Sequence, residues 1–312
     1  MSANRANINW HLANMIGGQM DVPTYGTKGY HPGAACFKTT GTIGLGLYIN
    51  RGTLACCDFR GTNGQSPLIA GGAEQLLYEV DLTQNYEVGA KEETPDGREF
   101  RYCKSTAAGV MRPDMGCNFT DTGYTAFTAF VVSAAIGATE VTVPAATHAT
   151  LTKNALRGGY ITIFDTLGVV TYQIVGNDAA ASGALFKVTL DMPLAATVTS
   201  ADYCETYKNP WGIIAQSTDT TLPKAGVPVA SVSAAANYFW LQTKGIKFIN
   251  PQPGCGADNG GIEVFWRHDG SIQKGETALA VTTATYDLNQ SAGVVIAGST
   301  TGNGPLVALK GY

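Results

Sequence analysis

Charge is scarce in this chain of 312 residues. Asp, Glu, Lys and Arg together make up 14% of it, whereas about 25% is usual for a soluble domain. A coiled coil or long-helix protein needs many more of these residues, so the composition excludes both. Lys and Arg occur singly, and the formal net charge is −4. A nucleic-acid binder needs a basic stripe to neutralise phosphates, so we expect no nucleic-acid partner.

Long apolar runs are also missing. No stretch approaches the roughly 18 consecutive apolar residues of a membrane-spanning helix. Residues 1–19 contain no basic segment followed by a hydrophobic run, which a secretory signal requires. We therefore expect a protein made in the cytoplasm, with no membrane partner. Hydrophobic residues nevertheless make up 45% and are spread along the chain, which predicts folded domains.

Clusters of metal ligands are absent from the sequence. A zinc site needs closely spaced soft ligands, such as two Cys-x-x-Cys pairs, and no His-Glu-x-x-His motif occurs. We therefore expect no metal site. An odd number of irregularly spaced cysteines, without a secretory signal, predicts buried thiols instead of a disulfide framework. The seven cysteines are Cys36, Cys56, Cys57, Cys103, Cys117, Cys204 and Cys255.

The usual catalytic motifs are missing as well. Gly41–Gly46 has its glycines in the wrong order for a dinucleotide-binding fingerprint, and no Gly-x-Ser-x-Gly nucleophile turn occurs. The His-Asp-Gly sequence at 268–270 pairs a base with a carboxylate, but Asp-Gly is typical of a hairpin turn. Glu92 and Glu93 are adjacent, and we interpret them as solvated surface charges. We predict no catalytic residue, no cofactor and no enzymatic activity.

Short alternating strands, separated by Gly, Asn and Asp, dominate the sequence. Tyr160–Asp165 and Val169–Val175 alternate apolar and polar residues, and the loop between them ends in Gly168, which suits a hairpin. A third strand with inward apolar residues is predicted over 186–190. Thr125–Ile136 fits both the helix and the strand period, and its β-branched residues favour a strand.

The same pattern continues on both sides of these strands. Further alternating or aromatic-rich strands are predicted at 98–104, 238–243, 262–267, 294–297 and 306–309. We therefore predict an all-β fold of short antiparallel strands in β-sandwich or barrel-like modules. The predicted division is a Gly-rich, loop-like arm over 1–78, a scaffold domain made of 79–125 and 206–312, and a β module inserted at 126–205.

The first part of the chain differs, because glycine recurs at short intervals and large residues are isolated. Such a segment builds a core poorly, since few side chains are large and glycine backbone is entropically costly to order. Two interpretations stay open: a loop-rich extension, or an arm that docks on a neighbouring subunit through aromatic anchors. The candidate interface residues are Trp10, Tyr25, Tyr30, Phe37 and Tyr48.

Seven stretches of the sequence share a recognisable pattern when taken in order: Tyr86–Gly89, Asp96–Tyr102 with Lys104, Ala138–Val143, Gly158–Ile163, Thr171–Ile174, Gly226–Ala230 and Asn237–Gly245. They resemble virion proteins of tailed bacteriophages, especially capsid-decoration (cement) and related head proteins. Together they cover residues 79–312, and the first 78 residues lie outside the resemblance.

The resemblance implies a non-enzymatic outer-capsid protein that binds the major capsid protein of the same virion and stabilises the head. It also implies a homo-oligomer, since such proteins often form trimers at local symmetry axes on the capsid exterior. Stabilisation would come from avidity, because many modest contacts across neighbouring capsomers together resist their separation. A surface rich in Thr, Ser, Asn and Gly suits this role, since charged residues are depleted from interface cores.

Three other functions stay open from the sequence. A tail, neck or fibre component would share the β-rich, weakly charged character. A carbohydrate-binding module or glycosidase would use aromatic side chains such as Trp240 and Trp266 to stack on sugars. A major coat protein is less favoured, because no long helix is predicted.

Overall fold

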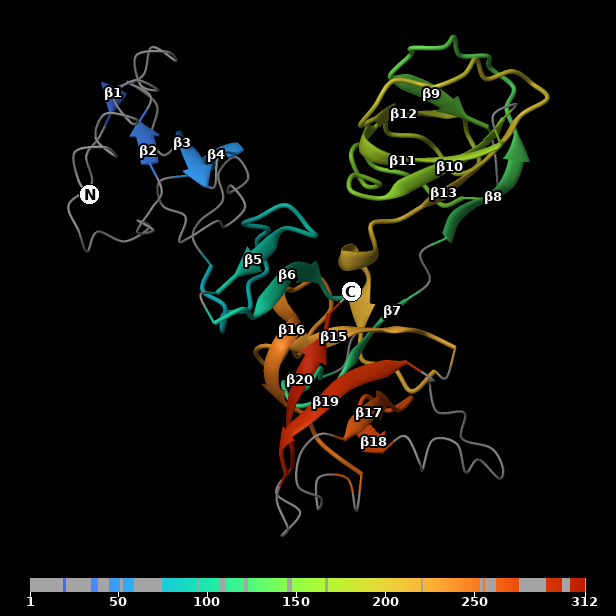
Figure 1. The fold of residues 1–312 in the computed structure, drawn as a ribbon. Helices are drawn as coiled ribbons and strands as arrows, with labels where there is room; N and C mark the ends of the chain where they lie inside the picture. The colour runs from blue at the N-terminus through green and yellow to red at the C-terminus, as the bar shows by residue number, and fades with distance from the viewer. Residues whose placement is uncertain are drawn as a thin grey trace.

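The structure, a computed structural model, describes most of the chain after residue 74. The described residues are 75–94, 96–106, 110–120, 123–144, 148–165, 168–219, 221–252, 255, 262–274, 290–298 and 304–311, together with the backbone of four strands before residue 59. Their strands pair in antiparallel ladders, and no α-helix occurs among them. The two larger sheets each curl into a half-barrel (Figure 1). The predicted all-β class is confirmed.

A six-stranded sheet, hereafter the inserted sheet, is built from residues 123–207. Its strand order is β8–β13–β10–β11–β12–β9. In chain order the strands are β8 (Gly123–Ala129), β9 (Glu140–Val143), β10 (Tyr160–Asp165), β11 (Gly168–Asn177), β12 (Phe186–Leu190) and β13 (Tyr203–Tyr207). The predicted hairpin is β10–β11, which closes at the pair Asp165↔Gly168. Gly168 has a φ of +113°, a backbone conformation that only glycine adopts easily.

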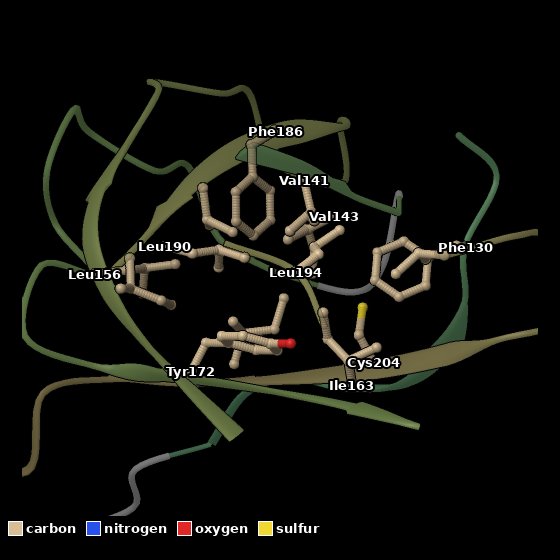
Figure 2. Packing of buried hydrophobic residues seen from close by; sticks show 14 of the residues in the cluster. Phe130, Val141, Val143, Leu156, Ile163, Tyr172, Phe186, Leu190, Leu194 and Cys204 are labelled. Atoms are coloured by element: carbon tan, nitrogen blue, oxygen red, sulfur yellow. The ribbon is translucent and has the colours of Figure 1, made fainter. Parts of the chain in front are cut away.

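Alternation along these strands separates a core face from an outer face. Ile163 of β10 and Tyr172 of β11 are buried on the core face. Figure 2 shows these side chains pointing toward Val141 of β9 and Phe186 of β12 across the half-barrel. Full burial of a large apolar side chain stabilises a fold by about 1.5–3 kcal/mol. The inserted sheet therefore has a hydrophobic core of its own.

A ten-stranded sheet, hereafter the base sheet, takes strands from both sides of the insertion. They are β5 (Lys91–Glu93), β6 (Glu99–Lys104), β7 (Cys117–Phe119), β14 (Ile214–Ala215), β15 (Lys224–Pro228), β16 (Tyr238–Phe248), β17 (Glu263–Trp266), β18 (Ile272–Lys274), β19 (Ser291–Ala297) and β20 (Leu306–Lys310). The long strand β16 lies at its centre and pairs with β6, β15 and β20. Segments before and after the insertion are thus joined in one sheet.

The base sheet buries both tryptophans that were candidates for sugar stacking. Trp240 of β16 is 0% exposed, and the rings of Tyr86 and Tyr102 meet it edge-on at 5.2 and 5.1 Å. Trp266 is 4% exposed and packs on Gly116, where a Cβ would lie 2.8 Å from its ring. The predicted use of these rings for sugar binding is wrong, because neither ring face reaches the surface.

The chain leaves the base sheet after β7 and returns to it through a single 3₁₀ turn, η1 (Pro210–Gly212) (Figure 1). Asn209 precedes this turn, and its Oδ1 accepts a hydrogen bond from the Trp211 backbone N–H at 3.0 Å. The same side chain donates from Nδ2 to the Val88 carbonyl at 2.9 Å. One buried amide therefore fixes the turn and ties it to the segment before β5.

Four strands lie in the part of the chain predicted to be a Gly-rich arm. They are β1 (Gln19–Met20), β2 (Ala35–Lys38), β3 (Leu45–Asn50) and β4 (Thr53–Asp58), paired in that order. The prediction did not include them. The signal for β3 was present, since Leu45, Leu47 and Ile49 alternate with Gly46 and Tyr48, but the frequent glycines around it obscured the period.

Two local predictions were wrong. The strand expected over 125–136 ends at Ala129, where the chain buries Phe130 and then bends. Glu92 is 7% exposed, whereas its neighbour Glu93 is exposed. Adjacent residues of a strand point to opposite faces, so this acidic pair does not share one solvated surface.

The prediction of buried thiols is confirmed for the described cysteines. Cys103, Cys117, Cys204 and Cys255 are buried and free. Desolvation raises the pKa of the Cys117 and Cys204 thiols to about 12, which leaves both as inert core groups at neutral pH. The side chains of the other three cysteines lie outside the described residues.

Candidate interaction surface

The outer face of the inserted sheet carries apolar side chains in a line across neighbouring strands. Phe164 of β10 lies directly opposite both Tyr203 of β13 and Val169 of β11. Phe127 of β8 extends the line, because its ring stacks on Tyr203 with centroids 4.5 Å apart and planes 7° apart. It also meets the Phe164 ring edge-on at 4.9 Å. We call Phe127, Tyr203, Phe164 and Val169 the apolar row.

The apolar row is open to solvent. Val169 is 66% exposed, Phe127 50% and Tyr203 40%. On a sheet with one buried face, these outward positions are ordinarily polar. Removal of such side chains from water is favourable by about 25 cal/mol for each Å² of apolar surface. Contiguous exposed apolar groups of this kind make the apolar row a candidate interaction site.

Polar groups border the apolar row, and they include a carboxylate, because Glu205 of β13 lies directly opposite Thr162. Thr162 and Thr171 lie one outward position further along β10 and β11, and their hydroxyls are 3.1 Å apart. Past the end of β8, the bend exposes Val131 (64%) and Val132 (41%). An apolar centre with a polar rim is the usual composition of a protein–protein interface.

A groove of about 740 Å³ lies between the two sheets. Lys104 and Tyr238 line it from the base sheet, Asn154 and Arg157 from the inserted sheet, and Lys208 from the connection between them. These residues are far apart in the sequence, so spacing alone gave no signal for the groove.

Positive charge gathers along this groove. The Nζ of Lys104 lies 5.4 Å from the centroid of the Tyr238 ring, and the Nζ of Lys208 lies 5.9 Å from that of Tyr124. Arg157 pairs with Glu87 at 2.9 Å. Ammonium groups held over aromatic rings suit a ligand or partner segment that carries negative charge.

The side chains of the interface residues predicted from the sequence are not among those that the structure describes. Trp10, Tyr25 and Tyr30 fall outside the described residues. Phe37 and Tyr48 belong to β2 and β3, where the description covers the backbone and not the side chains. Their proposed docking role stays a prediction.

Metal-ligand clusters and membrane-spanning helices are both absent from the described residues. Within this part of the chain, no group of three His, Cys, Asp or Glu side chains is placed to hold a metal ion. In the same part of the chain, no helix is long and apolar enough to cross a membrane. The His-Asp-Gly sequence at 268–270 is a turn between β17 and β18, as interpreted, with Gly270 at a φ of +90°.

Comparison with known proteins assigns the chain to no group. A scan against protein-family models matched no family, and searches of curated proteins and of solved structures found no match. The outer-face geometry and the sequence are therefore the basis for a functional proposal.

Proposed function

We propose that this chain is a non-enzymatic structural protein of a tailed-phage virion. Its role is that of an outer-capsid decoration protein, which binds the major capsid protein of the same virion and stabilises the assembled head. The phage-like stretches support this role, and two of them form the adjacent strands β6 and β16 at the centre of the base sheet. Binding through many repeated sites gives stability by avidity.

The apolar row is the observation that carries the proposal. Its aromatic groups occupy the outward face of a sheet that already has a complete core, so they add nothing to that core. Aromatic side chains that are rigidly held and exposed are typical interface anchors. The neighbouring Thr162 and Thr171 carry no charge, which lowers the desolvation cost when this part of the face is covered. A decoration protein repeated over a capsid needs both features: exposed aromatic anchors and a low desolvation cost at its contact face.

The proposal includes self-association on the capsid exterior. We propose a homo-oligomer, with a trimer as the specific expectation, in which the aromatic residues of the N-terminal arm contact a neighbouring subunit. Light scattering of the purified chain measures this directly, and a monomeric mass at all concentrations contradicts it.

The decisive experiment is binding of the purified protein to mature capsids that lack it. We expect saturable binding with a fixed stoichiometry and a higher temperature of capsid disruption. Phe127→Ser should weaken capsid binding at least tenfold, because it removes the ring that joins two others in the apolar row. Phe248→Ser is the matched control: this Phe is 45% exposed on the base sheet, and binding should persist.

Two outcomes count against the proposal. Absence of binding by the wild-type protein rejects a decoration role outright, and unchanged binding by Phe127→Ser rejects the apolar row as its contact. Mass spectrometry of virions separates the alternatives, because hundreds of copies place the protein in the head. A handful of copies places it in the tail, neck or fibres.

A further inference from the structure

A lysine lies in the core of the base sheet. Lys224 of β15 is 0% exposed, although lysine is almost never fully buried unless its charge is compensated. Its Nζ donates to the Asn118 side-chain Oδ1 at 2.8 Å and to the His268 carbonyl at 2.7 Å, with the Ser217 carbonyl at 3.4 Å. No carboxylate is among these acceptors. The amine is thus held among neutral oxygens, away from water.

Asn118 of β7 is also 0% exposed and is the register partner of Lys224 in the antiparallel ladder. Its Oδ1 accepts a second hydrogen bond, from the Ser217 backbone N–H at 3.3 Å. Its Nδ2 donates to the Leu222 carbonyl at 2.9 Å. The amide is therefore fixed in orientation, and its carbonyl oxygen is polarised by two donors.

Burial also favours the reactive form of the amine. Desolvation lowers the pKa of Lys224 to about 8, although the neighbouring Cys117 and Asp269 act to raise it. At neutral pH about a tenth of the amine is then uncharged and nucleophilic. The ammonium has three protons for its three acceptors, so loss of one proton frees an electron pair beside the Asn118 amide.

We propose that Lys224 and Asn118 join in an intramolecular isopeptide bond that forms within the folded base sheet. The Nζ of the neutral amine adds to the Asn118 Cγ, so the Nζ–Cγ bond forms while the Cγ–Nδ2 bond breaks. One Nζ proton transfers to Nδ2, which leaves as ammonia, and the product is a secondary amide. The step is redox-neutral and needs no co-reactant. Negative charge that develops on Oδ1 is stabilised by the Ser217 N–H.

The location gives this cross-link a mechanical consequence. Asn118 lies just before the inserted sheet in the chain and Lys224 just after it, 106 residues apart. The bond therefore forms a covalent link between the chain segment that enters the inserted sheet and the segment that leaves it. A pull on the inserted sheet then cannot separate β7 from β15. This inference does not depend on the proposed role in a virion.

The test is the intact mass of the full-length protein after complete denaturation. We expect a mass below that of the sequence by one ammonia, and a branched peptide that links the segments containing residues 118 and 224. The branched peptide excludes loss of ammonia from another asparagine. Lys224→Met should restore the full mass, and Asn177→Ala, which alters a buried Asn of the inserted sheet, should keep the loss.

Asn118→Asp gives a second, independent readout. The same bond then forms with loss of water, so the final mass equals that of the cross-linked wild-type protein. The inference is overturned if the folded wild-type chain keeps its full mass, with separate peptides, after incubation above pH 8, where the amine is mostly neutral. That result needs no variant and holds even if Lys224→Met fails to fold.

Discussion

The inserted sheet and the base sheet are both curled and antiparallel, yet they are built differently inside. The inserted sheet has one continuous apolar cluster between its walls (Figure 2). The base sheet has three smaller clusters. Buried hydrogen-bonding side chains occur in both, such as Asn177 and Thr206 in the inserted sheet and Gln75, Lys224 and Gln242 at the base sheet, and among the described residues they are more numerous at the base sheet. The first arrangement relies more on non-directional burial, and the second relies more on directional bonds that fix strand positions.

This difference explains what each sheet exposes. Because the inserted sheet is stabilised by its interior, its outer face is free to carry the apolar row. The base sheet holds Trp240 and Tyr102 inside, where their rings pack edge-on and the Tyr102 hydroxyl donates to the Gln75 side chain at 2.7 Å. Phe248 of the same sheet is 45% exposed. The exposed aromatic rings that pack on one another in the apolar row lie on the inserted sheet.

The largest test of this comparison removes one core side chain from each sheet. Phe186→Ala in the inserted sheet and Trp240→Ala in the base sheet should each cost about 3–5 kcal/mol of unfolding free energy. If each sheet is stabilised by its own core, hydrogen exchange should rise over β8–β13 in the first variant. In the second it should rise over β6, β15 and β16. Faster exchange in both sheets from either substitution would show that the two sheets unfold as one cooperative unit.

Much of the strand pattern was predictable because alternation is a local property of sequence. The β10–β11 hairpin followed from period-2 alternation and from Gly168, and the structure confirms both. The burial of Trp240 and Trp266 was not predictable in this way. Whether an aromatic residue faces core or solvent depends on which distant strands pair with its own, and β16 pairs with β6 across more than a hundred positions.

The candidate interaction surface could not be predicted from the sequence for the same reason. Nothing in the local sequence distinguishes the positions of Phe127, Phe164 and Tyr203 from other strand positions. They become one feature only when the order β8–β13–β10 brings their outward positions together. Asn118 and Lys224 likewise meet only through the β7–β15 register. The spacing of residues along the sequence does not indicate which distant strands pair.

A smaller test concerns the link between the two sheets. Asn209→Ala removes both the bond that caps η1 and the bond to the Val88 carbonyl, at an expected cost of about 1–2 kcal/mol. Hydrogen exchange should rise around residues 86–90 and 209–213 without opening either core. Arg157→Ala is the control: its ion pair with Glu87 is about half exposed on both sides and should contribute less than about 1 kcal/mol. Equal losses in the two variants would mean that the Asn209 amide has no special role.

The smallest test uses pH, because the ion pairs within the described residues gather in the base sheet. Hydrogen bonds from Lys91 at 2.9 Å and Lys244 at 3.0 Å hold the pKa of Glu99 below its ordinary value of 4.5. A lowered carboxyl pKa means that the unfolded chain binds the proton more tightly. The stabilisation is therefore complete well above pH 4.5 and is lost as pH falls through the folded pKa.

Glu99→Gln should lower the stability of the base sheet by less than about 1 kcal/mol at neutral pH, since both lysines are largely exposed. The deficit relative to wild type should shrink in acid, because protonation of Glu99 removes the same charge. Urea unfolding at several pH values, followed by hydrogen exchange in β6 and β16, measures this. The inserted sheet, whose core is apolar, should show no difference between the two proteins at any pH. A matching change in β10 or β11 would mean that charge in the base sheet stabilises both sheets, contrary to the separation drawn here.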